Sequence, residues 1–272
     1  MKILTISDTV VDLIYSPRLK EKFGDVELVL SCGDLPFYYL EYIVSILNVP
    51  LFYVMGNHDK EVEYSANGQA KTAPGGCVNI DNRVVQHKGL LIGGLEGSMR
   101  YNRNPRFQYT DPEMHFKVLQ MAPQLLSNRI FRGRYLDILI THAPPYRIHD
   151  GQDLCHRGFR AFLRFMDLFK PRYLIHGHRH LYGYDQTVVT HYKETQVVNI
   201  FGCQLLEWVE EIKVDFRSVN GQNTNHFKVA NAKNCRRDLR PHRSDAAGDG
   251  PHLGCQFRRR QSGSGRNDAP EL

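Results

Sequence analysis

Short apolar runs that each end in a polar turn are the feature of this sequence that most restricts its fold. Residues 2–7, 26–31 and 50–55 are continuous apolar runs of about the length of a strand. Runs without polar alternation are typical of strands whose two faces are both buried. Between the second and third runs, residues 38–48 carry apolar side chains at helical spacing. This alternation of strand and helix predicts an α/β fold.

Elements of the same types are predicted along the chain as far as residue 214. Asp111 and Pro112 are typical of a helix start, with Asp111 as the cap and Pro112 in the first turn. A polar, arginine-rich loop at residues 98–110 precedes this helix. The other predicted elements are a strand pair at 84–97, strands at 136–141 and 173–176, a helix at 156–169, and closing antiparallel strands at 188–192, 196–201 and 205–214.

The positive charge of the chain is concentrated at its C-terminal end. Residues 213–272 hold 12 Lys and Arg against 6 Asp and Glu, whereas residues 1–212 hold 23 of each and carry no net charge. The segment 213–272 also has few hydrophobic residues and no periodic apolar face, so burial cannot offset the entropy of ordering it. We therefore predict a globular domain at 1–212 and a basic, disordered tail at 213–272. The tail could bind nucleic acid, but a solvated tail without that role is favoured.

The sequence predicts neither a membrane protein nor a secreted one. No run approaches the roughly 18 consecutive apolar residues of a membrane span. The apolar run at residues 2–7 is too short for a signal peptide and is followed at once by Asp8. The 6 cysteines show no Cys-x-x-Cys spacing, which favours single thiols in a reducing compartment. We therefore expect a cytoplasmic protein without a membrane partner.

Five junctions between a strand and a turn carry Asp, Asn or His. They are Ser7-Asp8-Thr9, Cys32-Gly33-Asp34, Gly56-Asn57-His58-Asp59, Thr141-His142-Ala143-Pro144 and Gly177-His178-Arg179-His180. Because ligands bind at the carboxyl ends of parallel strands, we expect these side chains to meet at one edge of the fold. Oxygen and imidazole donors without thiolates suit Mn, Fe, Zn or a similar divalent ion. The glycines allow the tight turns and close backbone approach that such a site needs.

In this order, the five motifs make residues 1–212 similar to the calcineurin-like metallophosphoesterase superfamily. Members of that superfamily carry Asp-x-His, Gly-Asp, Gly-Asn-His-(Asp/Glu), a His after a strand, and Gly-His-x-His. The resemblance implies a metallophosphoesterase catalytic domain at 1–212. It also implies a four-layer α/β/β/α sandwich of two mixed sheets.

The resemblance further implies two divalent metal ions, with Mn²⁺ expected first and Fe²⁺, Ni²⁺ or Zn²⁺ as alternatives. By this resemblance the first ion is held by Asp8, Asp34 and His180, and the second by Asp34, Asn57, His142 and His178. His58 would face the leaving group, and Asp59 would orient and charge the His58 imidazole.

The implied activity is hydrolysis of a small phosphoester, a phosphodiester rather than a phosphomonoester, by a metal-activated hydroxide with His58 assisting the leaving group. Arg100 and Tyr101, in the arginine-rich loop, are the candidate contacts to substrate phosphate. Two alternatives stay open. One is a nuclease that holds nucleic acid with the tail, and the other is a non-catalytic scaffold of the same fold.

Position 10 departs from the superfamily pattern. Val10 stands where Asp-x-His has its histidine, so the first site loses one ligand and is expected to be weak or empty. A second polar cluster lies downstream and could supply the missing donor, or could be a polar loop leading into a helix capped by Asp153. Its members are His149, Asp150, Asp153, His156 and Arg157.

Overall fold

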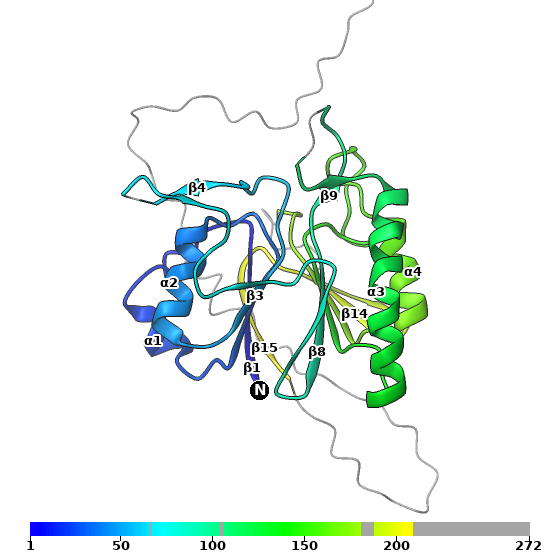
Figure 1. The fold of residues 1–272 in the computed structure, drawn as a ribbon, viewed down its shortest axis with the longest axis horizontal. Helices are drawn as coiled ribbons and strands as arrows, with labels where there is room; N and C mark the ends of the chain where they lie inside the picture. The colour runs from blue at the N-terminus through cyan, green and yellow to red at the C-terminus, as the bar shows by residue number, and fades with distance from the viewer. Residues whose placement is uncertain (66, 104–105, 181–187, 209–272) are drawn as a thin grey trace, which may run out of the picture. The chain divides into compact units, whose positions relative to one another are not determined.

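A computed structural model describes residues 1–65, 67–103, 106–180 and 188–208 of the chain. The elements lie in four layers, with two β-sheets in the middle and helices outside them (Figure 1). This arrangement confirms the predicted α/β/β/α sandwich of two mixed sheets. The predicted boundary at residue 212 and the predicted tail at 213–272 lie outside the described residues.

The first sheet has five strands in the order β15-β1-β2-β3-β6. They are β1 (Lys2–Ser7), β2 (Leu28–Ser31), β3 (Leu51–Tyr53), β6 (Val78–Asn79) and β15 (Gly202–Glu207). The first four run parallel to one another, and β15 is antiparallel to β1. Because β1, β2 and β3 end at the same edge of the sheet, the turns that follow them meet there.

The second sheet has six strands in the order β13-β14-β12-β11-β8-β7. They are β7 (Val84–His87), β8 (Leu90–Leu95), β11 (Ile138–Thr141), β12 (Tyr173–His176), β13 (Val189–Tyr192) and β14 (Thr195–Asn199). The four inner strands are parallel and the two outer strands antiparallel. Two short strand pairs lie outside the main sheets: β4 (Glu63–Tyr64) with β5 (Ala70–Lys71), and β9 (Ser98–Met99) with β10 (Gln108–Tyr109).

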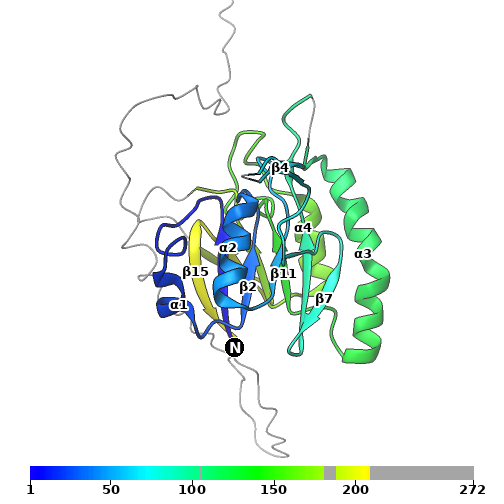
Figure 2. The same cartoon turned by 60° about the vertical axis from the view of Figure 1, so that its left-hand side comes forward.

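Helices cover the outer face of each sheet (Figures 1 and 2). The first sheet is covered by α1 (Arg18–Phe23) and α2 (Phe37–Leu47), and the second by α3 (Asp111–Arg132) and α4 (Arg160–Phe169).

Along β1, Ile3 belongs to the core between the sheets, whereas Leu4 and Ile6 belong to the core under α1 and α2. One strand therefore supplies two cores, which explains its lack of polar alternation.

None of the described helices is long and apolar enough to cross a membrane.

The helix starts differ from the sequence predictions. Thr110, not Asp111, caps α3, because its side chain accepts from the Glu113 backbone while the Glu113 carboxylate accepts from the Thr110 backbone. α4 begins at Arg160 rather than at residue 156, and its N-cap is Phe159. Asp153 therefore caps no helix there.

The closing strands also differ from the predictions. β14 is parallel to β12, and only β13 closes the second sheet antiparallel on that side. β15 crosses to the first sheet and pairs with β1. The part of the predicted strand beyond residue 208 lies outside the described residues.

Backbone strain marks the turns that end three strands. Asp8, after β1, has a φ of 66°, Asp34, after β2, a φ of 56°, and His178, after β12, a φ of 65°. Left-handed conformations are costly for residues with a Cβ and concentrate at functional sites. All three residues were predicted as metal ligands.

Candidate metal centre

The side chains of Asp34, Asn57 and His142 converge where the turns of the two sheets meet. His142 Nε2 lies 3.0 Å from Asn57 Oδ1 and 3.2 Å from Asp34 Oδ2. The other ring nitrogen, Nδ1, lies 2.7 Å from the Cys32 carbonyl oxygen and is assigned as the donor to it. Since Nδ1 makes that hydrogen bond, Nε2 is the ring nitrogen that can give up its proton and offer a lone pair to an ion, beside two oxygen atoms. Three electron-pair donors therefore point at one position.

The charges around this position favour a cation. Burial works to lower the pKa of His142. The charge of Asp34, and the hydrogen bond from the imidazole to the Asp34 carboxylate, outweigh burial and raise the pKa of His142 to about 9. Burial also works to raise the pKa of Asp34, but the charge of His142 and that hydrogen bond hold it well below its usual range. Positive charge is thus stabilised between the two side chains. A divalent ion supplies such charge, and these oxygen and imidazole donors suit it.

His178 adds a third side chain to this group from the turn after β12. The ligand atoms of Asp34, His142 and His178 all lie within 4.8 Å of one another. His178 Nε2 donates to the Cys155 carbonyl at 2.9 Å, the kind of hydrogen bond that orients metal-binding histidines. Burial lowers the pKa of His178 to about 3, so its ring is neutral and has a lone pair to offer. We call Asp34, Asn57, His142 and His178 the second-metal half.

Asp8 and His180 lie on the β1 side of the same centre. His180 Nε2 is 3.8 Å from Asp8 Oδ1. Both oxygens of the buried Asp8 carboxylate accept the backbone N–H of His178, at 2.9 and 3.1 Å. Burial raises the pKa of Asp8 to about 7, and a nearby cation favours the ionised form of such a group. We call Asp8, Asp34 and His180 the first-metal half.

Val10 contributes no donor to the first-metal half. Its side chain packs against the apolar cluster under α1 and α2. Three protein ligands with water in the remaining positions still make a reasonable metal site. The donor set of each half thus fits a divalent ion, with one protein ligand fewer in the first.

Two glycines allow the turns to approach this closely. A Cβ at Gly56 would lie 2.1 Å from Asp34 Oδ1. A Cβ at Gly177 would lie 1.9 Å from Ser7 Oγ and 2.6 Å from Asp8 Oδ2. Any larger residue at either position would therefore push a candidate ligand out of place.

His58 and Asp59 follow Asn57 but have different surroundings. The exposed His58 donates its backbone N–H to Asp34 Oδ1 at 2.8 Å, and its side chain lines a cavity beside the centre. The half-buried Asp59 carboxylate accepts three backbone N–H groups: those of Asp34 and Leu35 at 3.0 Å each, and that of Gly56 at 2.7 Å.

The contacts of Asp59 in the structure are thus with backbone N–H groups, and its role in orienting the His58 imidazole stays a prediction. Among the described residues, the Asp59 carboxylate binds the backbones of two metal-site turns. The desolvation of burial and then the charge of Asp34 raise its pKa to about 7.

The structure separates the two predicted substrate contacts. Tyr101 reaches the centre, because its hydroxyl accepts from Asn57 Nδ2 at 3.1 Å and so helps to hold the Asn57 amide. The Arg100 guanidinium instead pairs with the Glu113 carboxylate at 2.8 Å, next to the capping box of α3. The structure therefore favours a structural ion pair for Arg100 over the predicted contact with substrate.

A cavity of about 460 Å³ opens beside the second-metal half. Asp34, His58 and Asp59 line one side of it, and the exposed rings of Tyr38 and Tyr64 line another. These two tyrosines were not among the predicted site residues. Tyr38 lies in α2 and Tyr64 in the short strand β4, and no sequence motif distinguishes either residue.

The predicted second polar cluster is divided between two places. His149 turns to His176 and Thr190, at 2.9 Å from each, and burial lowers its pKa to about 4. Asp150 accepts the Gly158 backbone N–H at 3.3 Å. His156, in contrast, lies against the metal centre, with its ring centroid 5.1 Å from that of His178.

The chain is similar to known proteins in sequence and in fold. The family model for calcineurin-like phosphoesterases matches residues 1–182. An uncharacterized protein of Methanocaldococcus jannaschii is 28% identical over 193 residues, which are 66% of this chain and 80% of that protein. One crystal structure matches at a TM-score of 0.51 and 14% identity, over 75% of this chain and 94% of its own, and supports the fold. The crystal structure of TT1561 of Thermus thermophilus matches at a TM-score of 0.49 and 17% identity, over 75% of this chain and 93% of its own.

Proposed function

The chain belongs to the calcineurin-like phosphoesterase family, and from this premise we propose that it is a metal-dependent hydrolase of a small phosphodiester. The family is of a dinuclear metal-dependent type, and the described residues include a donor group of the matching kind. The observation that carries the proposal is the convergence of Asp34, Asn57 and His142 on a position that favours a cation.

Each half of the centre has a distinct part in holding the ions. Asp34 would bridge them, because its two carboxylate oxygens can accept at the same time. Two divalent ions, when bound, act as Lewis acids on the phosphoryl oxygens and lower the pKa of water to make a nucleophile available. Mn²⁺ is proposed first for the oxygen and imidazole donors, with Fe²⁺, Ni²⁺ and Zn²⁺ as alternatives.

His58 is the proposed proton donor to the leaving group. Its side chain is exposed to the cavity, while its backbone N–H holds the Asp34 carboxylate. A positioned acid of this kind contributes about 10²–10⁴ to the rate. Asp59 contributes indirectly, because it holds the turns that carry Asp34 and Asn57.

The charge of the cavity supports a diester over a monoester. Lys60 is the single lysine or arginine among the described residues that line it, and the carboxylates of Asp59 and Glu63 line it as well. A diester carries less negative charge than a monoester, so it needs less positive charge around it. The rings of Tyr38 and Tyr64 are available to the organic group of such a substrate.

A non-catalytic scaffold is the second candidate function, and Val10 is the observation that favours it. With its side chain packed in the apolar cluster, position 10 gives no ligand to the first-metal half. The exposed His58 favours the enzyme, because a scaffold needs no proton donor. The nuclease alternative depends on the basic segment 213–272, and binding that weakens steeply with salt and is lost on its deletion would support it.

Hydrolysis of bis(p-nitrophenyl) phosphate by the metal-stripped full chain, with and without Mn²⁺, tests the proposal. Asn57→Ala removes a ligand, and His58→Ala removes the proton donor. Arg100→Gln is the matched control, because Arg100 pairs with Glu113. We expect Mn²⁺-dependent turnover that both alanine variants lose and the control keeps. No turnover with Mn²⁺, Fe²⁺, Ni²⁺ or Zn²⁺ would overturn the proposal in favour of the scaffold.

A further inference from the structure

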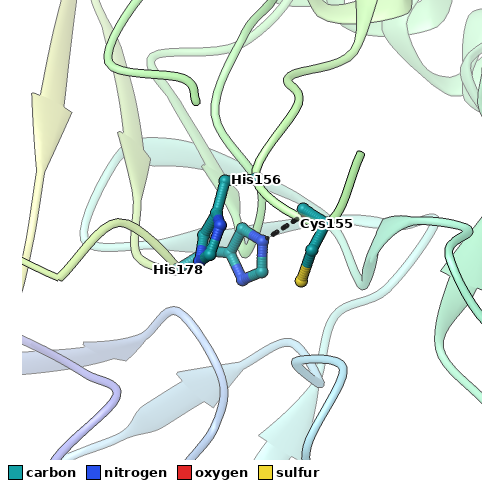
Figure 3. A group of neighbouring side chains, drawn as sticks. All are labelled: Cys155, His156 and His178. Atoms are coloured by element: carbon teal, nitrogen blue, oxygen red, sulfur yellow. Dashed lines mark hydrogen bonds between the residues drawn. The ribbon is translucent and has the colours of Figure 1, made fainter. Parts of the chain in front are cut away.

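Three donors gather on the side of the metal centre that faces the loop before α4. Cys155, His156 and His178 each offer one ligand atom, and these atoms all lie within 4.8 Å of one another. Figure 3 shows the His156 and His178 rings side by side, with Cys155 against His178. The ring centroids are 5.1 Å apart, with 33° between the ring planes. Cys155 and His156 belong to neither half of the centre described above.

His156 is held as a metal-binding histidine is usually held. Its Nδ1 lies 2.9 and 3.0 Å from the two Asp153 carboxylate oxygens, and its backbone N–H donates to Asp153 as well. A carboxylate on one ring nitrogen fixes the tautomer and leaves the other nitrogen to bind a metal ion. Asp153, which caps no helix, therefore has a positioning role.

Cys155 adds a donor of a different chemical kind. The Cys155 residue is 5% exposed. Its carbonyl oxygen accepts from His178 Nε2, so the Cys155 backbone is fixed against that imidazole. Thiolates bind Zn²⁺ and related ions far better than Mn²⁺.

We propose that Cys155, His156 and His178 form a nitrogen and sulfur site for Zn²⁺ or a similar ion, in which that ion takes the one lone pair of His178 in place of an ion in the second-metal half. Binding there displaces the thiol proton of Cys155 to solvent, since the thiolate is the ligand. Cys155 and His156 are thus two donors beyond those of the superfamily pattern. The inference rests on the proposed metal centre only through the shared His178.

Cobalt absorption tests this site without any assay of activity. Co²⁺ titrated into the metal-stripped full chain should give a near-ultraviolet thiolate-to-cobalt charge-transfer band. Cys155→Ser should lose the band and His156→Ala should weaken it. Cys77→Ser, which changes a cysteine packed under α1 and α2, should keep it. Zn²⁺ affinity should fall at least tenfold in Cys155→Ser, while Mn²⁺ affinity should not change.

Two results would overturn the proposal: no charge-transfer band in the wild type, or a band that persists in Cys155→Ser. Circular dichroism establishes that each variant is folded. Failure of the proposed function gives a different pattern, because the thiolate band would then be present without hydrolysis of the diester. The reverse pattern, hydrolysis without the band, would overturn only this site.

Discussion

The two halves of the metal centre are built from the same kind of turn, yet the chain supplies them unequally. In the second-metal half, His142 is fully buried and the carbonyl of Cys32 fixes its ring. In the first-metal half, the His180 side chain is 41% exposed and its Nε2 is 3.8 Å from Asp8. Val10, which follows Asp8 by two residues, packs into the core instead of the centre. We therefore expect the two halves to bind metal ions with different affinities, although they share the Asp34 carboxylate.

The largest expected effect comes from the residue that both halves share. Asp34→Asn keeps a residue type that tolerates positive φ but removes the charge that would bridge two ions. We expect loss of both ions, measured as metal content after dialysis. We also expect Asp34→Asn to hydrolyse the diester about 10³ times more slowly, because the variant loses about 4 kcal/mol of transition-state stabilisation. Retention of one full equivalent of metal would show that the halves do not depend on a common ligand.

A large loss of stability is expected from the residue that ties the turns together. Asp59→Ala leaves three backbone N–H groups without their acceptor, those of Asp34, Leu35 and Gly56. Unsatisfied buried donors cost about 1–3 kcal/mol each, and solvent access reduces the sum. We expect urea unfolding to show a loss of about 2–4 kcal/mol. If Asp59 acted only on the His58 ring, unfolding would be unchanged and only hydrolysis would fall.

A substitution at position 10 tests the weaker half directly. Val10→His restores the donor that the superfamily pattern has there, at the cost of some packing under α1 and α2. We expect about tenfold tighter binding of the weaker ion, in line with the usual contribution of a supporting group at a metal site. The tighter ion should be unaffected. Calorimetric titration of both variants with Mn²⁺ measures this, and an unchanged weaker step would contradict the assigned ligands.

The smallest effect is expected at Tyr101. Tyr101→Phe removes one hydrogen bond from the Asn57 amide, worth about 1 kcal/mol, so binding of the second ion should weaken about fivefold. The neighbouring Arg100→Gln breaks only the ion pair with Glu113 and should leave metal binding unchanged. Equal effects of the two variants would mean that the loop acts as a whole, without a specific role for the Tyr101 hydroxyl.

The α/β class could be predicted from the sequence because its signal is local, whereas the four-layer sandwich followed from the resemblance. Continuous apolar runs define β1, β2 and β11, and the turns after them carry the donors. The ligand positions followed from the resemblance, and the structure brings Asp34, Asn57, His142 and His178 together.

What sequence could not provide depends on long-range geometry. Asp59 binds backbone groups from two different turns, and Arg100 meets its partner only once α3 has folded. The start of α4 was also missed, because side-chain contacts hold the loop before it: His156 binds the Asp153 carboxylate, and Gly158 donates its backbone N–H to Asp150. Neither contact leaves a periodic signal in the sequence.

The inequality of the two halves is tested most directly by calorimetric titration of the metal-stripped chain with Mn²⁺, alongside His142→Ala and His180→Ala. The account predicts two binding steps of different affinity in the wild type. The tighter step should disappear in His142→Ala, and the weaker step should disappear in His180→Ala. Two equal steps, or a tight step that survives His142→Ala and is lost in His180→Ala, would contradict the account.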